Sequence, residues 1–261
     1  MKSIIKVIIS SLRIHMDQSF ARQTFKYVIL LQPILYSTLL YFMFKSSDEV
    51  NVGEYIVVGT GIISLWSSII FSSAGDIERE RYMGTLETLI ATPSNFIVIF
   101  FGKILGNIIL GIFSMFSSLI CVTMIFGLNV KIESLSAFSL AFLLTILSFS
   151  IISLLMASLF TLSRNSRMLM NCMEYPIYIL CGIIFPISLL PSFFQYISLM
   201  LIPTWSVKLM RSSMTGIDNY NIFFSEVLIF SILSILYLIL ALYLFKFINY
   251  KTKIKGDLGV Y

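Results

Sequence analysis

Charge is what this sequence has least of. Only 12 % of its 261 residues are Asp, Glu, Lys or Arg, against about a quarter in an ordinary soluble domain. Hydrophobic residues make up 58 % of the chain, and the mean hydropathy is +0.95. A chain with so few charges cannot cover its own surface with groups that water solvates, so it is not a soluble globular protein and its solvent is largely lipid. At about 20 residues per crossing, it has room for about five to seven spanning helices in one domain.

The residue types that carry most site chemistry are also scarce. There is one histidine, and the three cysteines, Cys121, Cys172 and Cys181, all lie in apolar runs without metal-ligand spacing. That pattern predicts neither a disulfide framework nor a zinc site. The G-x-x-x-x-G-K-[ST] sequence of a phosphate-binding loop is missing, so we do not expect this chain to bind ATP in that way. We therefore expect no catalytic residue, metal or cofactor in this chain.

Six apolar stretches predict the fold class, an all-α integral membrane protein with six transmembrane helices. They cover about residues 27–44, 55–73, 104–126, 138–162, 173–185 and 225–247, within one permease-like domain over 27–250. The ionisable residues Lys103, Glu174 and Glu226 fall near the ends of these spans. Ion-coupled transporters commonly place such groups at the midplane, so the pattern disfavours a secondary transporter and leaves it as an alternative.

The arm before the first span, residues 1–26, has apolar residues at helical spacing and five basic residues. This pattern predicts an amphipathic helix at the membrane interface. A signal peptide is disfavoured because Lys6 and Arg13 break the apolar core and no small-residue cleavage site follows. We expect His15, on this helix, to be an interfacial residue rather than a ligand or base.

The basic residues predict the orientation. Fourteen of the 18 Lys and Arg residues lie in the N-terminal arm, after the second span, after the fourth span and near the C-terminus, where residues 251–261 form a basic tail. Six spans bring these regions to one side of the membrane, and basic residues favour the cytoplasm. Both termini are therefore predicted to be cytoplasmic. Lipid headgroups explain the basic balance better than nucleic acid does.

A charged segment separates the second and third spans. It starts with Glu78–Arg81, and Gly84 then permits a sharp turn. Thr85 can cap a short helix to about Ala91, with Glu87 favourably placed in its first turn. Pro93 would end that helix, because the residue before a proline is pushed out of helical space. A merely solvated loop is the alternative interpretation.

Small residues recur at helical spacing in the second span. They are Gly61, Ser64, Ser68 and Ser72. Such stripes let helices approach closely, so the stripe is a candidate packing face, within the subunit or at a dimer contact, or a candidate wall of a substrate path. In the third span, Gly102 and Gly106 form a G-x-x-x-G helix-packing pattern.

Prolines break the chain after the fifth span. Pro186, Pro191 and Pro203 enclose residues 192–201, a stretch too short to span. We expect a re-entrant or interfacial hairpin on the extracellular side, with a loop continuing through Lys208, Arg211 and Asp218.

Two motifs resemble a known family. Glu78–Arg81 followed by Gly84-Thr85-Leu86-Glu87 and Thr92-Pro93 closely resembles the signature of the membrane subunits of type-2 ATP-binding-cassette (ABC) exporters, the drug, nodulation-factor and polysaccharide export permeases. The stretch Gly182–Pro186 through Pro191, Pro203-Thr204 and Arg211 is similar to the family's re-entrant region. The N-terminal helix and Gln32-Pro33 fit as well, so the resemblance covers the whole chain.

The resemblance implies a permease subunit that is not itself an enzyme, in the cell membrane of a prokaryote. It implies two separate ATPase subunits that bind ATP and Mg²⁺, and a second permease, identical or related, with the translocation path at the permease dimer interface. The residues it assigns to ATPase coupling are Glu78, Arg79, Glu80, Arg81, Gly84, Thr85, Leu86, Glu87 and Pro93.

The cargo is expected to be a hydrophobic drug, a lipid or a small peptide, because the polysaccharide exporters carry a differently patterned basic arm. A secondary transporter, a membrane enzyme and a non-catalytic membrane scaffold remain the alternatives. The membrane enzyme would need a polar catalytic cluster, which the sequence does not show.

Overall fold

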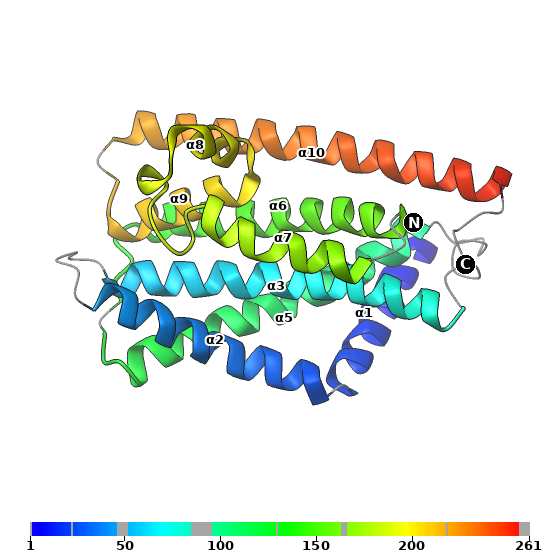
Figure 1. Ribbon diagram of the computed structural model, residues 1–261, viewed down its shortest axis with the longest axis horizontal. Coiled ribbons are helices and arrows are strands. Elements are labelled where there is room, and N and C mark those ends of the chain that lie inside the picture. Colours follow the sequence, from blue (N-terminus) through cyan, green and yellow to red (C-terminus); the bar gives the residue numbers. More distant parts are fainter. Residues whose placement is uncertain are drawn as a thin grey trace.

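A computed structural model describes residues 2–21, 23–45, 52–84, 96–128, 130–162, 166–217 and 219–255. Every regular element in these ranges is a helix, and Figure 1 shows most of the long helices lying roughly side by side in a bundle, with the first one crossing at one end. The elements are α1 (Lys2–Ala21), α2 (Gln23–Phe44), α3 (Val52–Tyr82), α5 (Phe96–Met124), α6 (Leu135–Leu162), α7 (Ser166–Leu180), the 3₁₀ helix η1 (Ile187–Leu189), α8 (Ser192–Met200), α9 (Ile202–Thr215) and α10 (Tyr220–Lys255). The start of α1 and the end of α10 lie at the same end of the bundle.

Several helices have the length and composition of membrane spans. Among the described residues, three stretches are long and apolar enough to cross a bilayer, Phe101–Met124, Leu135–Thr161 and Tyr220–Phe247, and Leu31–Phe44 is a shorter apolar helix. Hydroxyl groups in these helices bond back to carbonyls one turn earlier, as Thr145 does to Ala141. Such bonds let serine and threonine sit in an apolar medium without an unsatisfied donor.

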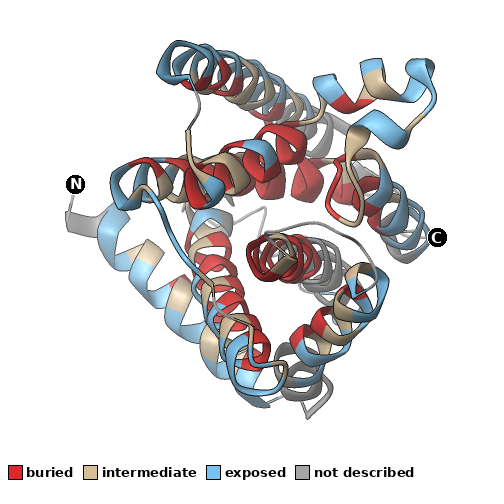
Figure 2. Cartoon of the chain, turned by 90° about the vertical axis from the view of Figure 1, so that its left-hand side faces the viewer, coloured by how far each residue is buried: buried red, intermediate tan, exposed pale blue. Residues whose placement is uncertain are grey.

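The helix α3 is the centre of the bundle. It contacts α2, α5, α6, α7 and α9, and its residues 56–68 are all buried. Figure 2 looks along the bundle and shows the buried residues on the inner faces of the helices. Trp66, 1 % exposed, packs edge-to-face on Phe149 at a ring-centroid distance of 6.2 Å. A displacement of α3 would therefore change the packing of the five helices that contact it.

The observed helices run further than the predicted spans. The predicted span 55–73 is part of α3, which continues without a break to Tyr82, so Glu78–Arg81 is its last turn. Glutamate and arginine are good helix formers, so this helix needs no break where its sequence becomes charged. Likewise α5 is one helix from Phe96, and α7 begins at Ser166 and ends at Leu180, unlike the predicted 173–185.

The region after α7 is more helical than predicted. Pro186 precedes η1, Pro191 precedes α8, and Pro203 lies in the first turn of α9. Proline is tolerated in a first turn because its missing N–H would have no partner there. The prediction that Lys208 and Arg211 lie in a loop is therefore wrong, because both lie on α9, while Asp218 is outside the described residues.

Candidate functional site

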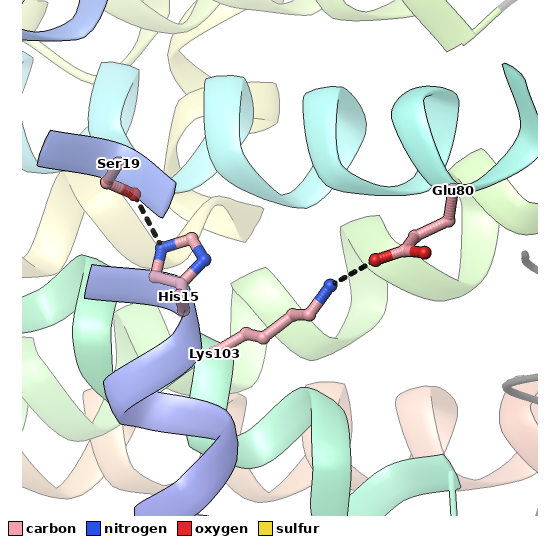
Figure 3. Close-up of polar contacts among 4 residues, drawn as sticks. All are labelled: His15, Ser19, Glu80 and Lys103. Atoms are coloured by element: carbon pink, nitrogen blue, oxygen red, sulfur yellow. Dashed lines mark hydrogen bonds and ion pairs between the residues drawn. The ribbon is translucent and has the colours of Figure 1, made fainter. Parts of the chain in front are cut away.

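An ion pair joins the last turn of α3 to the start of α5. Lys103 Nζ lies 3.0 Å from Glu80 Oε1, and the two side chains are 8 % and 13 % exposed. In Figure 3 they reach toward each other from the two helices. Because little water screens them, they attract more strongly than a surface pair does. The last turn of α3 and the first part of α5, which flank residues 85–95 in the sequence, are thus tied together.

The helix α1 packs on α5 beside this pair. A Cβ on Gly102 would lie 2.6 Å from the carbonyl oxygen of Ile8, and one on Gly106 would lie 2.8 Å from a ring carbon of His15. The G-x-x-x-G pattern is therefore the surface that receives α1. We call Glu80, Lys103 and the α1–α5 contact at His15 the charged junction.

His15 is an interhelical contact in this junction. Its Nε2 lies 2.7 Å from Asn107 Oδ1 and 3.4 Å from Ser19 Oγ, and the residue is 2 % exposed. Figure 3 shows the Ser19 contact within α1. Because α5 covers the face of α1 that carries it, His15 is buried between two helices, and a position of α1 at the membrane interface stays a prediction.

The predicted coupling residues lie at and beyond the end of α3. Gly84 has φ +68°, which confirms the predicted turn, and no atom of the described residues lies within 4 Å of the position of a Cβ there. Tyr82 is 92 % exposed and Met83 64 %. The side chains of Glu78, Arg79 and Arg81, and all of Thr85, Leu86, Glu87 and Pro93, are outside the described residues. The role of these residues stays a prediction.

The small-residue stripe of α3 faces α5. A Cβ on Gly61 would lie 2.7 Å from a side-chain atom of Met115, and Ser68 Oγ donates to the carbonyl of Asn107 at 3.3 Å. Ser64 is buried, and the side chain of Ser72 is outside the described residues. These contacts are within the chain, and a path or dimer role of the stripe stays a prediction.

A buried polar cluster lies where α2, α3 and α7 meet. Gln32 Nε2 donates to Ser67 Oγ at 2.7 Å, and Ser67 Oγ lies 2.6 Å from the hydroxyl of Tyr178. Both hydroxyls also reach Glu174 Oε1, at 3.0 and 2.8 Å. We call Gln32, Tyr36, Ser67, Glu174 and Tyr178 the polar cluster. Ser67 is near the middle of α3, so the cluster lies well inside the bundle.

The sequence placed Glu174 near the start of the predicted fifth span. In the structure it is in the middle part of α7, which begins at Ser166, seven residues before the predicted span, and it is 5 % exposed. The error came from starting the fifth span at Met173, because the polar residues before it broke the apolar run. The signal that could have found the cluster is the i, i+4 spacing of Glu174 and Tyr178, which puts both on one face of a helix.

The opposite end of the bundle is held by Arg211. Its Nη1 and Nη2 donate to the carbonyls of Gly182 and Ile183 at 2.6 and 2.8 Å. Its guanidinium carbon lies 3.3 Å from the ring centroid of Tyr55, near the start of α3. We call these four residues the far-end brace. The structure thus brings together Gly182, Ile183 and Arg211 of the second sequence motif.

The predicted hairpin prolines lie beside this brace. Gly182, with φ +69°, ends α7, and Pro186 and Pro191 lead into η1 and α8. Thr204, next to Pro203, donates through Oγ1 to the carbonyl of Ser198 at 2.6 Å, which joins α9 to α8. The predicted hairpin region therefore consists of two short helices, η1 and α8, and the Thr204 side chain joins α8 to α9. Whether it re-enters a membrane stays a prediction.

Metal chemistry has no obvious place in the described part of the chain. No group of three or more His, Cys, Asp and Glu side chains is gathered there in a way that could hold an ion. The polar contacts described above are hydrogen bonds, an ion pair and a cation–π contact.

A protein-family model described as ABC-2 type transporter matches residues 8–215. A comparison with curated proteins finds no match. The matched range starts inside α1 and ends with α9, so it includes the charged junction, the polar cluster and the far-end brace.

Proposed function

Because the chain belongs to the ABC-2 type transporter family, we propose that it is the permease subunit of an ATP-driven exporter whose ATPase is a separate polypeptide. Family membership and the apolar helices make it a membrane permease of an ABC transporter, the transmembrane component rather than the ATPase. Export, the partners and the cargo are the proposal.

The observation that carries the proposal is the continuity of α3. It is one helix from Val52 to Tyr82, buried among five other helices along its middle and exposed at its last residue. Glu80 and Lys103 tie that last turn to α5. A force on the chain just after Tyr82 would therefore act on two long helices together, and α3 would carry it into the core.

We assign the force to ATPase subunits that bind ATP and Mg²⁺. The segment they would contact runs from the end of α3 to Pro93, with Gly84 as its turn and Leu86 and Glu87 as contact residues. Closure of the ATPases on ATP would move this segment. The ends of α3 and α5 would follow because of the Glu80–Lys103 pair.

The assembly would contain two permeases, identical or related, and two ATPases, in the cell membrane of a prokaryote with both permease termini in the cytoplasm. The translocation path would lie at the permease dimer interface. Its cargo would be a hydrophobic drug, a lipid or a small peptide. The shared end of α1 and α10 supports placing both termini on one side.

Co-purification tests the assignment. The tagged chain is purified from the cells that naturally make it, and any ATPase that co-purifies and its activity are measured. We expect Leu86→Asp with Glu87→Lys to lower the bound ATPase at least tenfold. The control is Leu189→Asp, the same leucine-to-aspartate change as at position 86, at a residue 72 % exposed at the opposite end, which should stay within twofold. Intact assembly and transport in the Leu86 and Glu87 variant would refute the docking assignment.

A further inference from the structure

Glu174 is a buried carboxylate for which the described residues provide hydroxyl partners and no ion pair. Two other glutamates are less than a tenth exposed. Glu226 pairs with Lys208 Nζ at 2.7 Å, and Glu54 accepts the backbone N–H of Lys131, both near helix starts. Among the described residues, the partners of Glu174 are two hydroxyl groups. An ionised carboxylate deep in a span is costly and commonly marks a functional site.

The hydrogen-bond geometry makes Glu174 an acceptor with capacity to spare. Ser67 and Tyr178 both direct their hydroxyls at the same oxygen, Oε1. A carboxylate has about four acceptor positions on its two oxygens. No hydrogen bond to Oε2 is found among the described residues. A cationic donor is the ligand that would use this oxygen and neutralise the charge.

Tyr178, whose hydroxyl donates to Glu174, contacts two further tyrosines that are more exposed. Tyr178 meets Tyr36 edge-to-face at 6.0 Å and Tyr175 at 6.3 Å between ring centroids. Tyr178 is 1 % exposed, Tyr36 is half-buried and Tyr175 is 63 % exposed. The faces of such rings attract organic cations. A carboxylate with tyrosines beside it has the chemistry of an ammonium-binding site.

The helices α2 and α7, which carry most of the cluster, also expose side chains of mixed polarity. Asn171 and Tyr175 on α7 are exposed and Gln32 on α2 is half-buried, while Leu35 and Ile179 add exposed apolar side chains. Polar side chains at membrane depth face a wet cavity or another protein rather than lipid. This face can therefore meet a molecule with an apolar body and a polar head.

We propose that the polar cluster binds the positively charged group of an amphipathic cargo, with Glu174 as the counter-charge and Tyr36, Tyr175 and Tyr178 as the aromatic walls. The inference rests on the proposed function and deepens it, because it narrows the cargo to organic cations. Ser67 and Gln32 are positioning residues, since they hold the tyrosine and carboxylate oxygens in place.

Binding to the full chain in phosphatidylcholine nanodiscs tests this without the ATPase. The probe is 4-phenylbutylammonium, a cationic N–H donor on an apolar body, and 4-phenylbutyrate provides a similar shape with the opposite charge. We expect saturable binding of the cation, weakened at least tenfold by Glu174→Gln and at least threefold by Tyr175→Ala. The matched control is Glu133→Gln, which removes one negative charge from an exposed residue and should stay within twofold.

Absence of saturable cation binding to the wild-type chain would overturn the inference, and so would wild-type affinity in a folded Glu174→Gln variant. If that variant does not fold, Tyr175→Ala on the exposed surface decides, and unchanged affinity there refutes the site. Saturable anion binding at the same level as the cation would refute the role of charge. Because co-purification with an ATPase is measured separately, either proposal can fail while the other stands.

Discussion

The two ends of α3 are held in different ways. At the far end, the guanidinium of Arg211 on α9 donates to two backbone carbonyls of the turn after α7 and lies over the ring of Tyr55 near the start of α3, so one side chain joins three elements. At the charged junction, α3 is tied to α5 through two flexible side chains, and Gly84 follows without a close neighbour among the described residues. The difference suggests a helix anchored at one end and adjustable at the other. A push beyond Tyr82 would then tilt α3 about the far-end brace.

The largest loss of stability should come from the far-end brace. Arg211→Ala removes two charged hydrogen bonds and a cation–π contact, and should lower the free energy of unfolding by about 4 kcal/mol. Arg211→Lys keeps the charge and loses the planar guanidinium, so its free energy of unfolding should lie between those of the wild type and the alanine variant. Unfolding in mixed micelles measures both. A loss below about 1 kcal/mol for the alanine variant would remove the brace from the comparison.

The next effect should come from the surface that receives α1. Gly102→Val would place side-chain atoms against the backbone of Ile8, which cannot move aside as a flexible side chain could, at a cost of about 1–3 kcal/mol. Hydrogen exchange in α1 should then rise while exchange in α9 stays unchanged. Phe116→Val, on the exposed face of α5, is the control. Unchanged protection of α1 in the Gly102 variant would show that its docking does not depend on this contact.

Breaking the ion pair should have a moderate effect on stability. Lys103→Met removes the cation that pairs with the nearly buried Glu80. It should lower the free energy of unfolding by about 2 kcal/mol, between the values for surface and buried pairs. The double variant with Glu80→Gln should recover part of this loss, which a double-mutant cycle measures. Full additivity of the two single changes would show that the pair does not couple the helices.

The smallest effect should come from the middle of α3. Ser67→Ala removes hydroxyl contacts with Tyr178, Glu174 and Gln32, and should cost about 1 kcal/mol. Ser68→Ala, one position away, removes a longer bond to a carbonyl and should cost less. Thermal unfolding of the two variants side by side tests the order. A reversed order would mean that the polar cluster contributes less than its distances suggest.

Local sequence patterns predicted the features that depend on local physics. The apolar runs placed the long helices to within several residues, the turn at Gly84 followed from its lack of a Cβ, and the G-x-x-x-G pattern marked a packing surface. The burial of His15 was missed because its partner, Asn107, is 92 residues away in the sequence. The helix α9 was missed because Pro203 was interpreted as a breaker, although it occupies a first turn.

The polar cluster was missed for a similar reason. Glu174 follows several polar residues, so it looked like the boundary of a span, and only the packing of α7 on α3 shows that it is buried beside Ser67. The argument that no ionisable group lies near the middle of a predicted span depended on that boundary, and a helix that begins at Ser166 has Glu174 in its middle part. A boundary error of seven residues was enough to make Glu174, which is in the middle part of α7, look like the end of a helix.

The central claim is that the exposed end of α3 contacts an ATPase, and site-specific photocross-linking tests it most directly. Tyr82, 92 % exposed, would be replaced by p-benzoylphenylalanine in cells that make the whole transporter, with Leu189 replaced in the same way as the far-end control. We predict a cross-link from position 82 to a nucleotide-hydrolysing polypeptide and none from position 189. Cross-linking to that polypeptide from position 189 alone, or from neither position in a complex that hydrolyses ATP, would contradict the account.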